Sequence, residues 1–271
     1  MTILLRNSRI RLSQRQIFWR EVGIGPALVF LHGSWSDSSQ WLPLIDHLCR
    51  DYHCFAPDLL GFGDSERPDV HYSIDLEVEC LAEFLETLKL RQVYLIGHSL
   101  GGWIAASYAL KYLDRVRGVV LLAPEGLPDH RWRKNGWWTR WLLSSPDVMF
   151  WLLRSLQPLT KFLGPQDKIT QMLLLRQQLL QNPTACQLLY QRPWSEIQAE
   201  LLHERLEWLK VPVLILQGGR DTQSAIARSR SYADSLPTAE MRIIGRGDHD
   251  LPQELPDTLA ELIRDFLSQE S

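Results

Sequence analysis

The sequence predicts an α/β protein in which a mostly parallel sheet is covered by helices on both faces and carries one helical insertion. Two observations support this fold class. Short apolar runs that end in turn residues recur along the chain, separated by stretches of helical length, which is typical of a parallel sheet. Between residues 125 and 208 this alternation stops, and leucine, glutamine and tryptophan predominate without a clear strand.

The predicted strands are apolar throughout, as expected for strands that are buried on both faces of a sheet. They cover residues 27–31, 52–57, 93–96, 118–123, 211–217 and 240–244. Ser73 is the expected N-cap of a helix that reaches about Leu90, with Asp75 and Glu77 in its positive first turn. An amphipathic helix over residues 255–267 is expected to dock against the sheet and complete the fold.

These patterns predict one domain whose core is interrupted by a cap. The first part of the core covers residues 1–124, the helical cap residues 125–208, and the second part of the core residues 209–271. Seven of the eleven tryptophans lie in the cap, so we expect its interior to be strongly aromatic.

The composition is that of an ordinary globular protein, with 45% hydrophobic residues, 23% charged residues and a net charge of −3. A nucleic-acid-binding protein would normally carry a basic stripe and a high pI, so we expect no nucleic-acid partner. The histidines and cysteines show no metal-ligand spacing, and no metal is expected. The cysteines are scattered and are expected to be reduced, buried thiols: Cys49, Cys54, Cys80 and Cys186.

Membrane and targeting signals are also missing from the sequence. No apolar stretch reaches the roughly 18 residues that would predict a membrane span. Residues 1–20 contain five arginines among short apolar groups and lack the continuous apolar core of a secretory signal. The default expectation is therefore a cytoplasmic protein.

The segment Gly97-His98-Ser99-Leu100-Gly101 carries the strongest chemical signal. It follows the predicted strand at 93–96 and precedes a helical run over 103–112, the strand–turn–helix context of a G-x-S-x-G nucleophile elbow. The glycines are expected because side chains at 97 and 101 would collide with the neighbouring strand or helix. His98 is expected to be a packing residue and not a second base.

Several motifs, in this order along the chain, together resemble the α/β-hydrolase superfamily, in its branch of capped esterases, haloperoxidases, epoxide hydrolases and C–C hydrolases. These are His32-Gly33-Ser34, the turn over residues 58–65, the elbow, Gly218-Gly219-Arg220-Asp221 and a late His249. The resemblance covers nearly the whole chain. It implies an α/β-hydrolase fold with the cap inserted after the sixth core strand.

A catalytic triad of Ser99, Asp221 and His249 follows from these positions. A serine hydroxyl needs an adjacent base, and the base needs a third group that fixes its tautomer. The chain order serine, acid, histidine is the one expected for this fold. Asp221 follows a predicted strand at its carboxyl end, where ligands bind in open α/β sheets.

Other acids remain as alternatives to Asp221. Asp248 and Asp250 flank the histidine, but side chains adjacent in sequence point elsewhere. Glu125 follows the strand that ends at Ala123, in the acid position that some members of the superfamily use.

Two backbone N–H groups are expected to form an oxyanion hole. One belongs to Leu100, at a helix N-terminus where the dipole also favours negative charge. The resemblance places the second at Ser34, with Trp35 as the alternative donor.

The cap suggests an apolar substrate, since a helical cap above the triad would roof the pocket. Trp35, Trp137, Trp138 and Trp141 are the candidate substrate-binding residues. The alternative is that each tryptophan only packs the cap against the core. An aromatic cap could also make a peripheral membrane contact to collect a lipophilic substrate.

The expected activity is hydrolysis of a small hydrophobic ester, thioester or related acyl compound without a cofactor. Dehalogenases and epoxide hydrolases that resemble this chain carry aspartate at the elbow, so Ser99 disfavours their chemistry. A haloperoxidase-like or C–C bond hydrolase remains an alternative. Ser34-Trp35-Ser36-Asp37 departs from the run that follows the first His-Gly in many C–C hydrolases. A binding protein without turnover is the second alternative.

Overall fold

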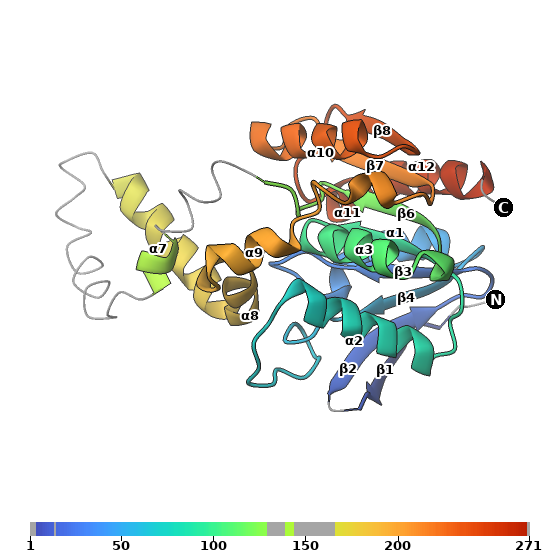
Figure 1. Cartoon of the computed structure of the whole chain (residues 1–271), viewed down its shortest axis with the longest axis horizontal. Coiled ribbons are helices and arrows are strands. Elements are labelled where there is room, and N and C mark those ends of the chain that lie inside the picture. Colours follow the sequence, from blue (N-terminus) through green and yellow to red (C-terminus); the bar gives the residue numbers. More distant parts are fainter. Residues whose placement is uncertain (1–3, 14, 129–138, 144–165, 270–271) are drawn as a thin grey trace.

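A computed structural model describes residues 4–13, 15–128, 139–143 and 166–269 of the chain (Figure 1). Its centre is an eight-stranded sheet in the order β1-β2-β4-β3-β5-β6-β7-β8. The strands are β1 (Arg6–Arg11), β2 (Gln16–Val22), β3 (Ala27–Leu31), β4 (His53–Pro57), β5 (Val93–His98), β6 (Val116–Leu122), β7 (Val213–Gly218) and β8 (Ala239–Ile244). From β4 to β8 the neighbours are parallel, whereas β2 is antiparallel to both β1 and β4.

Helices cover both faces of this sheet (Figure 1). They are α1 (Leu42–Leu48), α2 (Ile74–Thr87), α3 (Leu100–Lys111), α10 (Gln223–Ser235), α11 (Leu251–Glu254) and α12 (Pro256–Gln269). Residues of α2, α3 and α10 share one hydrophobic cluster with the sheet, and residues of α1, α11 and α12 share another. The expected mostly parallel sheet with helices on both faces is confirmed.

The central strands explain why their sequences are apolar without alternation. Leu95 and Val119 contribute to the cluster under α2 and α3, whereas Ile96 and Val120 contribute to the cluster under α1 and α12. All four side chains have no exposed surface, because successive strand residues point to opposite faces and both faces are covered.

The expected N-cap at Ser73 is also present. Ser73 has an extended backbone, its side chain accepts a hydrogen bond from Leu76 N, and Asp75 and Glu77 occupy the first turn of α2. The four cysteines are buried and free. Strands β1 and β2 were not expected from the sequence. They form an antiparallel edge in which every residue of β1 is exposed or only partly buried.

The regular elements described between β6 and β7 are all helices, and α7, α8 and α9 lie to one side of the sheet in Figure 1. They include residues 139–143, α7 (Gln166–Gln181), α8 (Pro183–Cys186), a π-helix (Gln187–Gln191), α9 (Trp194–Glu200) and a short 3₁₀ helix (Leu206–Trp208). The remainder of the predicted cap lies outside the described residues.

A buried ion pair connects the last part of this segment with the core. Arg192 is 4% exposed and donates to both carboxylate oxygens of Glu200, at 2.8 and 2.5 Å. The same carboxylate accepts from Ile74 N at the start of α2, at 3.1 Å. Trp103 Nε1 in α3 donates to Glu200 O at 3.2 Å. The pair therefore joins α9 to two helices of the core.

Candidate active site

Ser99 lies at the sharp turn between β5 and α3. Its backbone has φ 52° and ψ −111°, a left-handed conformation that costs a non-glycine residue about 1–3 kcal/mol. A Cβ at Gly97 would lie 2.3 Å from Gly101 O, and a Cβ at Gly101 would lie 2.1 Å from Leu31 O. Neither position can accept a side chain, as the sequence predicted. The turn holds Ser99 at the carboxyl edge of the sheet.

Asp221 and His249 meet at the same edge, because they follow the adjacent parallel strands β7 and β8. His249 Nδ1 lies 2.8 Å from Asp221 Oδ2. Gln217 Nε2 and Thr222 N also donate to the Asp221 carboxylate, at 2.9 and 2.6 Å. Since a carboxylate only accepts, the proton of a neutral His249 resides on Nδ1, and Nε2 is its basic nitrogen.

The electrostatics of this pair suit a general base. Burial raises the pKa of Asp221, but the hydrogen bonds from His249, Gln217 and Thr222 outweigh burial and hold this pKa below its ordinary value. Burial lowers the pKa of His249, but the hydrogen bond and the charge of Asp221 outweigh it, so this pKa lies above its ordinary value. The pair therefore stabilises an imidazolium, the form that a base reaches after taking a proton.

Glu125 occupies an unexpected place beside the serine. Ser99 Oγ–H donates to Glu125 Oε1 at 3.3 Å, and no hydrogen bond among the described residues joins Ser99 to His249. The His249 ring still lies next to the elbow, since its centroid is 4.9 Å from that of the His98 ring. Of the acids considered, Asp221 is the one hydrogen-bonded to the imidazole, and Glu125 contacts the hydroxyl instead.

His98 belongs to a hydrogen-bond network, whereas the sequence suggested only packing. Its Nε2–H donates to His249 O at 2.9 Å, and Gln40 Nε2 donates to His98 Nδ1 at 2.7 Å. Burial lowers the pKa of His98 to about 3, which keeps the ring neutral. Gln40, 1% exposed, also accepts from Gly33 N and donates to Asp250 Oδ1, both at 3.1 Å. The loop after β3 is thereby tied to the loop that carries His249.

The two expected oxyanion donors flank the nucleophile. Leu100 is the first residue of α3, and Ser34 is buried in the loop after β3. This loop runs close to the elbow, because a Cβ at Gly33 would lie 2.9 Å from His98 Nδ1 and 3.5 Å from Ser99 Cβ. Among the described residues, no hydrogen bond uses the N–H of Leu100 or Ser34. Both N–H groups remain available to a ligand.

The turn over residues 58–65 supports the loop after β3 from below. Asp58 is buried and accepts from Ser38 N and Asp64 N, both at 2.7 Å. His32 Nε2 accepts from Leu59 N at 3.0 Å. Its Nδ1 donates to Gly33 O at 2.9 Å, so the ring is a neutral structural bridge. The turn over residues 58–65, one of the motifs that resemble the superfamily, thus positions the loop that contains Ser34.

The family can now be assigned, because the model of the alpha/beta hydrolase family matches residues 28–262. The chain belongs to this family. Human monoacylglycerol lipase ABHD6 is 26% identical in sequence, over 91% of this chain and 76% of the lipase. The resemblance identified from the motifs is confirmed.

Solved structures of other alpha/beta hydrolases share the fold. A membrane phospholipase A, described as a bacterial virulence factor, has a TM-score of 0.76 and 23% identity, covering 98% of this chain and 86% of its own. An esterase from Thermogutta terrifontis has a TM-score of 0.74 and 22% identity, covering 98% and 99%. Ester-cleaving enzymes thus recur among the relatives, which supports ester hydrolysis in general without naming a substrate.

The candidate substrate-binding tryptophans are only partly described. Trp137 and Trp138 lie outside the described residues. Trp141 is partly buried and packs against a hydrophobic cluster of Leu142, Leu179 and Cys186, all of which lie in the same segment between β6 and β7. Trp35 follows Ser34 and is 39% exposed, so its ring is accessible beside the site.

Neither a metal-binding group nor a membrane span occurs among the described residues. The described residues contain no group of three or more His, Cys, Asp or Glu side chains that could hold a metal ion. Within the same parts of the chain, every helix is too short or too polar to cross a membrane.

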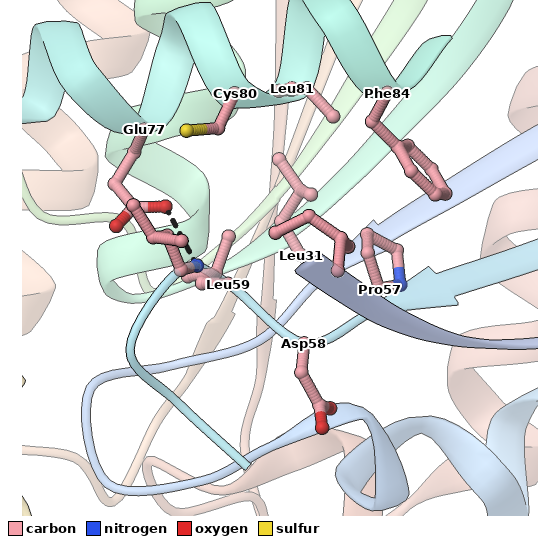
Figure 2. A pocket seen from close by; sticks show the side chains of 10 residues that line it. Leu31, Pro57, Asp58, Leu59, Glu77, Cys80, Leu81 and Phe84 are labelled. Atoms are coloured by element: carbon pink, nitrogen blue, oxygen red, sulfur yellow. Dashed lines mark hydrogen bonds between the residues drawn. The ribbon is translucent and has the colours of Figure 1, made fainter. Parts of the chain in front are cut away.

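A cavity of about 20 Å³ lies between α2 and the ends of β3 and β4 (Figure 2). Glu77 points into it, accepts from Leu60 N through Oε2 at 3.2 Å, and has no partner for Oε1 among the described residues. Burial raises the pKa of Glu77 to about 8. The cavity has room for about one water molecule and is far too small for a substrate.

Proposed function

We propose that this alpha/beta hydrolase cleaves a hydrophobic carboxylic ester, thioester or related acyl compound through an acyl-enzyme on Ser99. The observation that carries the proposal is the 2.8 Å contact between His249 Nδ1 and Asp221 Oδ2, at the sheet edge where the strained Ser99 lies. The names of the relatives, lipase and esterase, support an acyl substrate.

In this scheme Ser99 Oγ attacks the carbonyl carbon while its proton passes to His249 Nε2. The carbonyl electron pair moves onto oxygen, where the N–H groups of Leu100 and Ser34 stabilise it. Collapse expels the alcohol or thiol, which takes the proton from His249. Water then attacks the acyl-enzyme by the same proton transfers, which releases the acid and restores Ser99.

The nucleophile must change its hydrogen bond before it reacts. In the structure Ser99 Oγ–H donates to Glu125 Oε1, with 3.3 Å between the two oxygens. In the proposed scheme, rotation of the Ser99 side chain turns Oγ–H from Glu125 to His249 Nε2. Hydrogen bonds in active sites without substrate are often long or poorly aligned and tighten when substrate binds.

Labelling with a fluorophosphonate, followed by intact-mass measurement, tests the proposal. Wild type should gain a single adduct, and Ser99→Ala should gain none. Ser107→Ala is the matched control, because Ser107 lies in α3 but away from the elbow, and this variant should label as wild type does.

Hydrolysis of nitrophenyl esters of increasing acyl length provides the second measurement. Ser99→Ala should lower kcat by about 10⁶-fold, the loss typical of a missing triad serine. Wild-type protein that neither labels nor hydrolyses any ester would contradict the proposal and favour a binding protein.

A further inference from the structure

Glu125 is a carboxylate next to the nucleophile that the proposed acid–base pair does not use. The imidazole of His249 is already held by Asp221 at 2.8 Å. Glu125 Oε1 accepts only the long hydrogen bond from Ser99 Oγ, at 3.3 Å. Its Oε2 is buried and finds no hydrogen-bond partner among the described residues. A carboxylate in this state has capacity for further donors.

The backbone fixes Glu125 in this position. Its N–H donates to Ser99 O at 3.0 Å, which ties it directly to the elbow. Tyr232 OH donates a short hydrogen bond to Glu125 O from α10. Arg228 Nε donates to Pro124 O at 2.7 Å, and Leu202 N donates to Gly126 O at 2.9 Å. Residues on both sides of Glu125 are thus anchored, which holds the backbone of Glu125 beside the elbow.

Among the described residues, Ser99 is the one hydrogen-bond donor to the Glu125 carboxylate, and the proposed reaction removes it. When Ser99 Oγ–H turns to His249, neither carboxylate oxygen keeps a hydrogen bond from the described residues, although the side chain is partly buried. Leaving a charged group unpaired there is unfavourable. A substrate that brings its own donor to Glu125 would remove this penalty, whereas a substrate with an anion there would increase it.

We propose that Glu125 determines specificity by accepting a hydrogen bond from a hydroxyl group that the substrate carries close to its scissile ester. The preferred substrates are therefore neutral hydroxy esters, such as partial esters of a polyol, and esters with a carboxylate or phosphate at that place are rejected. This inference rests on the proposed function of Ser99, since the scissile carbonyl must lie at its Oγ.

The test compares three octanoate esters of nearly equal size on wild type and on Glu125 variants. Hydroxyethyl octanoate carries the donor, propyl octanoate replaces the hydroxyl with a methyl group, and carboxymethyl octanoate carries an anion. Wild type should prefer the hydroxyethyl over the propyl ester by about tenfold to a hundredfold in kcat/KM, as expected for a hydrogen bond to a charged group. The carboxymethyl ester should be the poorest substrate.

Two substitutions distinguish the role of the acceptor oxygen of Glu125 from the role of its negative charge. Glu125→Ala removes both, so the ratio for hydroxyethyl over propyl ester should fall to about one. Glu125→Gln keeps an acceptor oxygen and removes the charge, so it should retain part of this ratio while hydrolysis of the carboxymethyl ester rises about tenfold or more relative to the propyl ester. Glu204→Gln, at a carboxylate that is 86% exposed, is the control and should leave every ratio unchanged.

The outcomes distinguish this inference from the proposed function. Equal hydrolysis of the hydroxyethyl and propyl esters by wild type, or a preference that Glu125→Ala preserves, would overturn the role of Glu125 and leave Ser99 as the nucleophile. Failure of wild type to hydrolyse any of the three esters or to react with fluorophosphonate would overturn both.

Discussion

Gln40 is the point at which the loop after β3 meets the loop of His249, and Gln40→Leu would break this connection. The substitution keeps an apolar stem of similar volume and removes three hydrogen bonds. These bonds join Gln40 to Gly33 N at 3.1 Å, to His98 Nδ1 at 2.7 Å and to Asp250 Oδ1 at 3.1 Å. Without these hydrogen bonds, the Ser34 N–H should no longer be held in one position.

The magnitudes follow from burial. Gly33 and His98 are buried and would keep unpaired polar groups, each of which costs about 1–3 kcal/mol, whereas Asp250 is partly exposed and can turn to water. The free energy of unfolding should therefore fall by about 2–6 kcal/mol. Loss of one complete oxyanion donor lowers kcat by about 10²–10³-fold, so a displaced donor should lower it by about 10–100-fold.

Urea denaturation and ester kinetics on the same preparations measure both effects. Gln92→Leu is the control, because Gln92 is exposed and its side chain bonds only to Arg117 in the described part of the chain. Gln40→Leu with the expected loss of stability but a kcat within about threefold of wild type would refute the argument, because the network would then support the fold without positioning the site.

Two further predictions concern titration. His249 must be neutral to act as the base, so activity should fall as the pH drops through its pKa. Burial lowers the pKa of His249, but Asp221 raises it by more, so this pKa lies above 6.5. Asp221→Asn should move this inflection in the pH–rate profile to lower pH, and an unmoved inflection would contradict the pairing. Burial raises the pKa of Glu77 from 4.5 to about 8, so the folded protein holds a proton that the unfolded chain releases. The free energy of unfolding should therefore decline between these pH values and level off above them, by on the order of 5 kcal/mol in total. In Glu77→Gln, followed by urea denaturation across this range, that decline should be absent; an identical pH dependence in wild type and variant would show that Glu77 does not titrate there.

The sequence predicted those parts of the molecule whose signal is local. The central strands are recognisable because both faces are covered, which leaves an uninterrupted apolar run such as residues 27–31. Ser73 is recognisable because a cap acts within one turn of helix. The elbow is recognisable because a Cβ at Gly97 or Gly101 would lie only 2.1 to 2.3 Å from backbone oxygens, so both positions require glycine.

The parts that the sequence did not predict depend on distant partners or on an exposed face. The edge strand β1 has the sequence RNSRIR, and its three arginines are exposed to solvent. It therefore lacks the apolar run by which the central strands are recognised. Gln40 is an ordinary loop residue in sequence, and its partners His98 and Asp250 are 58 and 210 residues away. The contact of Glu125 with Ser99 depends on side-chain orientation, which periodicity and spacing do not specify.

The buried pair of Arg192 and Glu200 limits where caps could be exchanged between related chains. A chimera with a foreign segment up to residue 208 would lose the Glu200 carboxylate, which is the acceptor for Ile74 N. It would also replace the backbone around Glu200 O, which accepts from the Trp103 indole. A junction placed before Arg192 would keep both members of the ion pair and their contacts with α2 and α3. The segment between β6 and β7 can thus be exchanged only on the N-terminal side of this pair. A junction on the C-terminal side would disturb α3, the helix that follows Ser99.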